Sequence, residues 1–454
     1  MGRIKPQLCD QLLKATEAIG WVIRHELPLE QALARVLANV VDESSRGAIT
    51  DLSFYGLRSY GRGLELVRAV SSKSRIKPVF LEDFLALCCA LLSDQSETKY
   101  LPYTLVDQAV YASQSHAQLH RAQGFVNACL RNLLRQLPAF LAKVNQSLVA
   151  QWSFPLWWIN KVQQEYPDHW QLILEQANEH PPMVLRVNRR VCDALTYQKR
   201  LHEHGLHSLS LGVQGVLLFK PVSVEQLPGF RQGHVSVQDS AAQMAVPLLN
   251  PQHGQRVLDC CAAPGGKTGH LLEWADIDLL ALDSQAARLE KVHENYVRIQ
   301  PTLGASHRFQ ASAVRAEDVD RWWDGQEFDL ILADLPCSGS GVVRRHPDIR
   351  WLRQPGQLND LSQIQHTILD SLWSTLKPGG TLLQVTCSIF AEEGRLLTDA
   401  FLAKHADAKL LPTSLGVTLP VRNDLDVQGG LKSPRYGLSP DGFSFALFNK
   451  AVLN

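Results

Sequence analysis

Two cysteines in short polar motifs are the residues of this chain best suited to chemistry. Cys337 ends the motif Asp334-Leu335-Pro336-Cys337, Cys387 lies within Thr386-Cys387-Ser388, and an apolar run precedes each motif. Such runs are typical of buried strands, and open α/β sheets bind their ligands at the carboxyl ends of their strands. The pattern therefore predicts two thiols at two strand ends, where both can act on one substrate.

Paired thiols suit covalent catalysis at an aromatic carbon. Carbon C5 of cytosine is a poor nucleophile, but a thiolate that adds to C6 makes C5 enamine-like and able to attack an electrophilic methyl group. The C5 proton must then leave so that the thiolate can be eliminated. One cysteine can attack while the other assists release, and the residues alone do not decide which. The competing interpretation, two buried apolar cysteines, is disfavoured by their position at separate strand ends.

A loop of small residues precedes both motifs and indicates a cofactor site. Residues 259–268 read Asp-Cys-Cys-Ala-Ala-Pro-Gly-Gly-Lys-Thr and join a predicted strand to a predicted helix. A ligand can approach such a backbone closely, and the helix N-terminus offers free N–H groups. The spacing of a dinucleotide fingerprint and that of a phosphate-binding P-loop are both absent.

An acidic residue after the second predicted strand extends this site. Asp283 follows Asp259 by 24 residues, a position from which a carboxylate can accept both hydroxyls of a ribose. NAD and an adenosine-type methyl donor both satisfy this pattern. A simpler interpretation makes Asp283 a cap of the next helix, and the two roles are compatible.

The elements that must position these residues form an α/β domain. Alternation of strands and helices from about residue 236 predicts a parallel sheet covered by helices on both faces. The predicted strands are 256–259, 278–283, 328–333 and 380–386, and the predicted helices include 266–274 and 285–299.

The preceding part of the chain reads differently. Residues 1–148 show helical periodicity, with predicted helices at 9–23, 29–41 and 80–92. Residues 149–235 read as a small α/β segment, in which a helix at 158–179 is stopped by a double proline before a strand at 183–187. We therefore predict three domains, at 1–148, 149–235 and 236–454.

Composition sets the compartment and the broad class. The 454 residues contain 45 Lys and Arg against 45 Asp and Glu, so no global field marks a nucleic-acid binder. The first residues lack the apolar core of a signal peptide, and the most apolar stretch, 84–92, is too short to span a membrane. Nine scattered cysteines lack metal-ligand spacing. We expect a reduced, cytoplasmic protein without a bound metal, a monomer that does not contact membranes.

The motifs resemble those of the RNA cytosine-C5 methyltransferases of the NOL1/NOP2/sun family. The resemblance rests on residues 261–267, 334–338 and 386–388, and it is supported by 182–189, 237–243, 342–351 and 441–443. It implies a Rossmann-like class I methyltransferase domain at 236–454, an all-helical NusB-like RNA-binding domain at 1–148 and a small α/β RNA-binding subdomain between them.

The resemblance also implies roles for individual residues. Cys387 would be the nucleophile, and Cys337 would serve product release. Asp334 would contact both the cofactor and a flipped-out base. The residues implied to bind S-adenosylmethionine are Cys261, Ala262, Ala263, Pro264, Gly265, Gly266, Lys267, Asp283, Ser312 and Asp334. Ser312 departs from the family, which usually has an aspartate there.

A basic segment follows the first cysteine motif. Arg344, Arg345 and Arg350, with Trp351 among them, suit looped or single-stranded RNA. Ordinary ion pairs with Asp348 and its neighbours are the alternative.

The function implied is methylation of C5 of a specific cytosine in 16S ribosomal RNA, free or within an assembling small subunit. Two alternatives stay open: the same chemistry on transfer RNA, and a non-catalytic RNA-binding or ribosome assembly factor. The retained pair of cysteines argues against the second.

Overall fold

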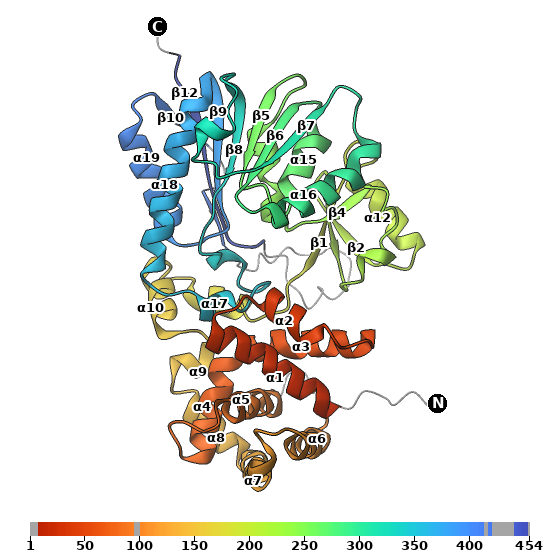
Figure 1. The fold of residues 1–454 in the computed structure, drawn as a ribbon, viewed down its shortest axis with the longest axis vertical. Helices are drawn as coiled ribbons and strands as arrows, with labels where there is room; N and C mark the ends of the chain where they lie inside the picture. The colour runs from red at the N-terminus through yellow and green to blue at the C-terminus, as the bar shows by residue number, and fades with distance from the viewer. Residues whose placement is uncertain (1–7, 95–99, 413–415, 420–439, 453–454) are drawn as a thin grey trace. The chain divides into compact units, whose positions relative to one another are not determined.

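The chain folds into two compact units (Figure 1). The computed structural model describes residues 8–94, 100–412, 416–419 and 440–452. The first unit comprises Met1–Asn178 together with Val343–Pro355, and the second comprises Glu179–Val342 and Gly356–Asn454. The helical unit therefore extends beyond the boundary predicted at 148, and it takes in a segment that lies far along the sequence.

The first unit is helical. Its helices are α1 (Leu8–His25), α2 (Leu29–Leu37), α3 (Glu43–Arg58), α4 (Tyr60–Ser71), α5 (Val79–Ser93), α6 (Pro102–Ser115), α7 (Gln123–Arg135), α8 (Leu137–Val144), α9 (Leu148–Trp152), α10 (Leu156–Glu165), α11 (Trp170–Gln176) and the late α17 (Ile349–Leu352). Helix α5 is apolar on nearly every side and almost wholly buried, as expected of a central helix.

Two of the predicted helices differ from the structure. The helix predicted at 29–41 ends at Leu37. The helix predicted at 158–179 is two helices, α10 and α11, separated at Tyr166 and Pro167. Proline lacks a backbone N–H and clashes with the preceding turn of a helix, so the first helix ends before Pro167.

The second unit is built on an eight-stranded sheet. Its strands are β5 (Arg256–Cys260), β6 (Asp278–Asp283), β7 (Arg308–Ala313), β8 (Phe328–Asp334), β9 (Leu376–Thr386), β10 (Ala408–Leu411), β11 (Val417–Thr418) and β12 (Phe443–Lys450). They lie in the order β10-β12-β9-β8-β5-β6-β7, with β11 paired to β12. Strands β5 to β9 are parallel to one another. The chain runs outward from β5 to β7 and returns to β8 on the other side, which places a topological switch point between β5 and β8.

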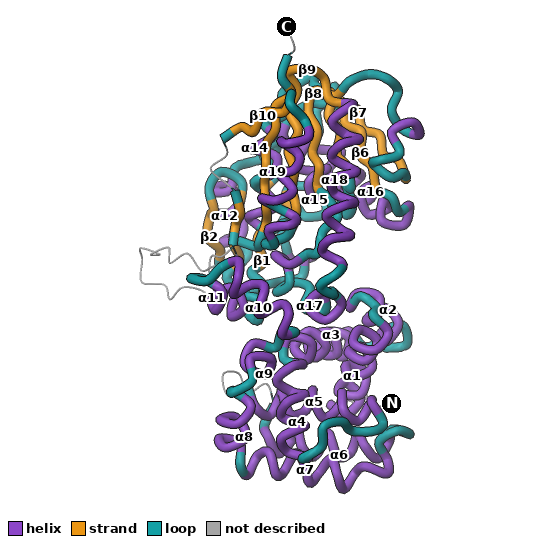
Figure 2. Tube along the Cα trace, turned by 90° about the vertical axis from the view of Figure 1, so that its left-hand side faces the viewer, coloured by secondary structure: helices purple, strands orange, loops and turns teal. Residues whose placement is uncertain are grey.

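Helices cover both faces of this sheet because its strands alternate between two apolar clusters. Leu330 and Leu332 pack toward helices α14 (Ala245–Leu249) and α15 (Gly266–Trp274). Ile331 and Ala333 pack toward α18 (Gln357–Thr375) and α19 (Arg395–Lys404). Figure 2 views the sheet from the side that α18 and α19 cover. Helix α16 (Ala286–Ile299) joins β6 to β7. The predicted sheet with helices on both faces is confirmed, and strands β5 to β9 are parallel as predicted. The sheet as a whole is mixed, because β12 pairs antiparallel with β9, and β10 and β11 pair antiparallel with β12.

A second, smaller sheet belongs to the same unit. Strands β1 (Met183–Val187), β2 (Ser208–Leu211), β3 (Gly215–Leu218) and β4 (Val235–Val237) are antiparallel in the order β2-β3-β1-β4. Helix α12 (Ala194–Glu203) packs on the sheet through Tyr197 and Leu201. The strand predicted at 183–187 is present with those bounds.

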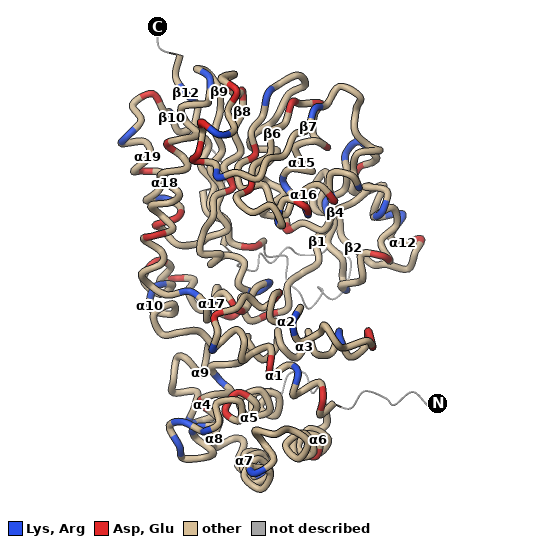
Figure 3. The backbone as a smooth tube through the Cα atoms, in the orientation of Figure 1, with Lys and Arg blue, Asp and Glu red and all other residues tan. Residues whose placement is uncertain are grey.

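Charge is mixed over both units. Figure 3 shows Lys and Arg interspersed with Asp and Glu along the backbone, in keeping with the zero net charge. Within the described ranges, no helix combines the length and the apolar character needed to cross a bilayer.

Two glycines form a close backbone contact at the end of the large sheet. The N–H of Gly442 donates to the carbonyl of Gly341 at 2.9 Å, and the N–H of Gly341 donates to the carbonyl of Cys387 at 3.0 Å. A Cβ atom on Gly341 would overlap the backbone of Gly442. The contact therefore requires glycine and ties the segment before β12 to the loops after β8 and β9.

Replacing Gly341 by alanine tests this contact. Because neither backbone can retreat without losing a hydrogen bond, Gly341→Ala should destabilise the second unit by about 1–3 kcal/mol, seen as a lower melting temperature. Gly356→Ala is the matched control, since a Cβ there meets open space. Equal melting temperatures for the two variants would show that the contact is not restrictive.

Candidate active site

The two cysteines meet at the end of the large sheet. Strands β8 and β9 are parallel neighbours, with Asp334 opposite Val385 in the register. The chain leaves both strands at the same edge, and the Sγ atoms of Cys337 and Cys387 lie 3.2 Å apart. Both residues are partly exposed. The two thiols that the sequence predicted at separate strand ends are therefore in direct contact.

A buried carboxylate holds the loop that carries Cys337. Glu393 has no exposed surface and belongs to a short 3-10 helix, Ala391–Glu393. Its Oε1 accepts from the N–H of Ser338 at 2.7 Å and its Oε2 from the Ser338 hydroxyl at 2.5 Å. Gln365 of α18 donates both to Glu393 Oε1 at 3.2 Å and to the carbonyl of Pro336 at 2.8 Å. The Pro-Cys loop is thus fixed on both sides of the thiol.

Serine hydroxyls connect this loop to the one that carries Cys387. The Oγ of Ser388 lies 2.8 Å from that of Ser340 and 3.3 Å from that of Ser338. The N–H of Ile389 donates to Ser340 Oγ at 2.9 Å. All three serines are buried. Buried polar networks whose members are hydrogen-bonded are rigid, so the distance between the thiols is set by the surrounding backbone.

The surroundings of Cys337 favour its protonated form. The hydrogen bond with Cys387, burial, and the negative charges of Cys387 and Glu393 together raise the pKa of the Cys337 thiol well above its usual range. Cys337 therefore stays a thiol at neutral pH.

A cation lies on the other side of the pair. Lys267 Nζ is 2.6 Å from Asp334 Oδ2, and the side chain of Lys267 is 12% exposed. Burial lowers the pKa of Lys267, but the charges of Asp334 and Cys387 outweigh it and raise the pKa above its ordinary value. Lys267 is therefore a fixed positive charge within electrostatic reach of Cys387.

The predicted cofactor loop lies beside these groups, between β5 and α15. Gly265 has φ of +97°, and a Cβ there would press on the backbone of Val292, so the turn into the helix requires glycine. The N–H of Ala262 donates to the carbonyl of Leu282 at 2.8 Å, and that of Ala263 donates to Asp283 Oδ2 at 3.2 Å. The loop is thereby tied to the end of β6.

Three carboxylates surround the loop. Asp259, Asp283 and Asp334 end β5, β6 and β8, or lie next to the end. Burial raises the pKa of Asp259 to about 7, helped by the charges of Asp334 and Asp283 and opposed by a hydrogen bond from Thr268. The Oδ1 atom of Asp259 is buried without a hydrogen-bond partner in the described structure. Lys267 pairs with Asp334, and Nη1 of Arg288 lies 3.5 Å from Asp283 Oδ2, so cations balance two of the three carboxylates.

Asp283 and Ser312 occupy the neighbouring strand ends. Besides Ala263, the carboxylate of Asp283 accepts from the N–H of Gln285 at 3.0 Å. The N-cap of α16 is Gln285 and no side chain caps this helix, so the interpretation of Asp283 as the helix cap is wrong. Ser312 lies in the edge strand β7, half-buried, opposite Leu282 of β6.

The basic segment after the Pro-Cys loop is largely internal to the helical unit, which corrects an expectation. Arg350 has no exposed surface; it donates to the carbonyls of Ser153 and Ala177 at 3.2 and 2.8 Å, and its guanidinium lies 3.8 Å from the ring centre of Phe154. Arg350 is not available to RNA in this structure, because its side chain is buried and both Nη atoms donate within the helical unit.

The other residues of the basic segment are buried to different extents. Arg344 is only 2% exposed, and the indole N–H of the half-buried Trp351 donates to the carbonyl of Leu57 at 2.8 Å. An RNA-contact role is thus unsupported for Arg344 and Trp351. Arg345 keeps part of its surface and remains a proposed RNA contact.

Sequence reasoning missed Glu393, Gln365 and the linking serines. Glu393 is the second residue of a Glu-Glu pair, six residues after Cys387. Adjacent acidic residues are usually exposed to solvent. The burial of Glu393 comes from tertiary packing against α18, of which the local sequence carries no signal.

Sheet order, switch point and loop define a Rossmann-like class I methyltransferase fold, and comparison with solved structures agrees. The crystal structure of PH0851 superposes with a TM-score of 0.72 at 22% identity and covers 97% of this chain and 99% of that one. The structure of a methyltransferase homologue from Pyrococcus horikoshii superposes with a TM-score of 0.54 at 24% identity and covers 66% of this chain and 97% of that one.

Sequence comparison identifies the family. The model described as "16S rRNA methyltransferase RsmB/F" matches residues 246–441, and an RsmF/B-like ferredoxin-like domain matches 154–225. A ribosomal RNA small subunit methyltransferase B from Escherichia coli is 42% identical over 88% of this chain and 91% of its own length. A ribosomal RNA small subunit methyltransferase B from Pseudomonas putida is 36% identical over 96% of this chain and 97% of its own length. The chain belongs to the RsmB/F family of methyltransferases, which confirms the resemblance predicted from its motifs.

The role of Glu393 can be tested with a substitution that keeps the shape of the side chain. Glu393→Gln keeps the acceptor for the N–H of Ser338 but removes the charge and presents an amide to the Ser338 hydroxyl. We expect a stability loss of about 1.5–3 kcal/mol and a loss of methyl transfer of about 10- to 100-fold, because misplacement of a reacting group is costly.

Glu294→Gln, at an exposed position of α16, is the control for this measurement. It removes the same charge on the protein surface, and we expect it to unfold and react like the wild type. If Glu393→Gln matched it in both melting temperature and methyl transfer, Glu393 would not organise the site.

Proposed function

We propose that this protein transfers a methyl group from S-adenosylmethionine to C5 of a cytosine in 16S ribosomal RNA, through a covalent bond between Cys387 and C6 of the base. Cytosine 967 is the proposed position, on the resemblance alone. The observation that carries the proposal is the contact of two thiols 3.2 Å apart with a cation near one and a buried carboxylate near the other.

The family and the cofactor loop support S-adenosylmethionine over NAD. The chain belongs to a methyltransferase family, and residues 259–268 lack the glycine spacing of a dinucleotide fingerprint. Asp283 suits the ribose of either cofactor. When bound, S-adenosylmethionine supplies an electrophilic methyl group. The residues that would hold it are those of the loop 261–267, with Asp283, Ser312 and Asp334.

The attack is assigned to Cys387. Its thiolate, with Lys267 within electrostatic reach, adds to C6 of the cytosine; the C5–C6 double bond is lost and C5 becomes nucleophilic. After C5 has taken the methyl group, it still carries its proton.

The release is assigned to Cys337, and the adduct itself prepares it. Two of the causes that raise the pKa of Cys337 are the hydrogen bond and the charge of Cys387, and both disappear when Cys387 Sγ is bonded to carbon. Cys337 can then lose its proton to water and accept the proton from C5. The C5–C6 double bond reforms, and the Cys387 thiolate leaves.

The names of the relatives favour ribosomal over transfer RNA as the substrate of this chain. A non-catalytic assembly factor would not need two contacting thiols in opposite electrostatic surroundings. The substrate is proposed to be 16S ribosomal RNA, either free or in an assembling subunit.

The roles assigned to the two cysteines predict opposite effects when each is replaced by alanine. Cys387→Ala should abolish methyl transfer and form no adduct, whereas Cys337→Ala should accumulate an RNA–protein adduct that survives a denaturing gel. Adduct formation by Cys387→Ala instead would reverse the roles, and normal complementation of a deletion strain by the double Cys→Ala variant would support a non-catalytic function. Bisulfite mapping of ribosomal RNA, with and without the gene, identifies the nucleotide.

A further inference from the structure

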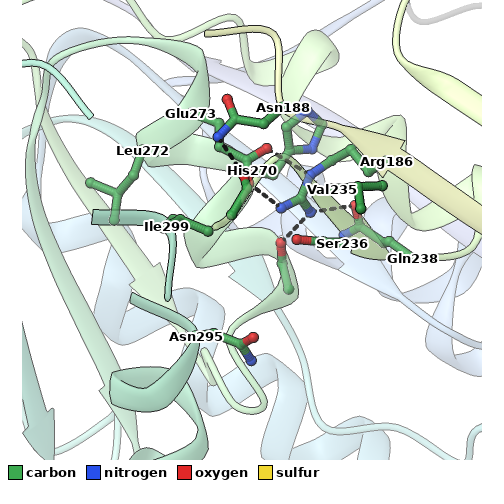
Figure 4. Close-up of polar contacts among 12 residues, drawn as sticks. Arg186, Asn188, Val235, Ser236, Gln238, His270, Leu272, Glu273, Asn295 and Ile299 are labelled. Atoms are coloured by element: carbon green, nitrogen blue, oxygen red, sulfur yellow. Dashed lines mark hydrogen bonds and ion pairs between the residues drawn. The ribbon is translucent and has the colours of Figure 1, made fainter. Parts of the chain in front are cut away.

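A buried arginine of the small sheet reaches the cofactor loop of the large one. Arg186 of β1 is 1% exposed. Its Nε and Nη2 donate to Oε2 and Oε1 of Glu273 in α15, at 2.9 and 2.8 Å. Its Nη1 donates to the carbonyl of Gly266 at 2.6 Å and to Gln238 Oε1 at 2.6 Å. Figure 4 shows Arg186 with Glu273 and Gln238.

The carbonyl that Arg186 binds belongs to the first residue of α15. The first turn of a helix exposes backbone N–H groups that have no partner within the helix, and these are the groups that a ligand approaches. A planar guanidinium that pairs with a carboxylate through two parallel bonds is fixed in orientation as well as distance. Because Glu273 lies near the other end of α15, Arg186 contacts both ends of the helix and sets how far its first turn extends toward the sheet edge.

Packing supports this view of Arg186 as a spacer. A Cβ on Gly269 would lie 3.5 Å from Arg186 Nη2, so the guanidinium lies against the backbone of α15. Glu273 is 2% exposed. The small sheet therefore approaches the helix as closely as side chains allow.

We propose that Arg186 is a positioning residue for the cofactor: it holds the first turn of α15 through the carbonyl of Gly266, so that the small sheet forms part of the cofactor site. The nature of the cofactor rests on the proposed function. In consequence, whatever moves the small sheet changes the affinity for the cofactor.

The chain offers a matched control in Arg190. This residue also belongs to the small-sheet segment and also binds α15: Nε donates to the carbonyl of Leu272 at 3.1 Å, and Nη2 lies 2.7 Å from Asp276 Oδ1. Its contacts are at the C-terminal end of the helix, away from the loop. If the arginines merely attach one sheet to the other, both should matter for stability and neither for the cofactor.

The experiment compares Arg186→Lys and Arg190→Lys in the full chain. Each keeps the charge and loses the planar guanidinium with its several directed donors, which in Arg186 form a bidentate pair with Glu273. Calorimetric titration with S-adenosylhomocysteine gives the dissociation constant, and steady-state assays give KM for S-adenosylmethionine and kcat. For Arg186→Lys we expect the dissociation constant and KM to rise about 10-fold, with kcat at saturating cofactor within about threefold of the wild type. For Arg190→Lys we expect wild-type values of all three.

Each other outcome has a defined meaning. Unchanged affinity in Arg186→Lys, or equal losses in both variants, overturns the positioning role. If Arg186→Lys does not fold, Glu273→Gln removes the carboxylate that orients the guanidinium and should likewise raise the dissociation constant; unchanged affinity there also overturns it. Failure of the wild-type protein to bind S-adenosylhomocysteine would instead refute the cofactor assigned under the proposed function.

Discussion

The site depends on the hydrogen bonds that the buried Glu393 accepts. They fix the loop after β8, and the linked serine hydroxyls fix the loop after β9 to it, so that two thiols from separate strands remain 3.2 Å apart. The parallel sheet brings the loops to one edge, but a sheet edge alone allows loops to move. The buried carboxylate converts their proximity into a defined geometry, as the proposed attack by one thiol and release by the other would require.

The same arrangement gives the two cysteine thiols different electrostatic surroundings. Glu393 and the partner thiol raise the pKa of Cys337, whereas Lys267, paired with Asp334, lies within electrostatic reach of Cys387. The order of attack and release is a proposal that the residues alone left open, and the charges of Glu393 beside Cys337 and of Lys267 near Cys387 support it. In the proposed mechanism, bonding of Cys387 to carbon would remove part of what keeps Cys337 protonated.

Much of this could be predicted from the sequence, for reasons that particular residues make clear. Strands β6 and β8 and helix α15 were predictable because apolar alternation and small-residue loops are local signals. Cys337, Cys387 and the loop from Cys261 to Lys267 stand in short motifs. The buried state of Glu393, Arg186 and Arg350 was not predictable, because each charge is satisfied by partners distant in sequence. Arg350 was misread for this reason: a basic residue near a catalytic loop suggests RNA, whereas its partners belong to the helical unit.

The difference between the two thiols is most directly tested by alkylation of the wild-type protein with iodoacetamide over a range of pH, with each cysteine quantified by mass spectrometry. The thiolate is the reacting form, so the account predicts that Cys387 is modified first and that Cys337 reacts slowly up to a pH well above that at which ordinary thiols react. Faster modification of Cys337 than of Cys387 at neutral pH would contradict it.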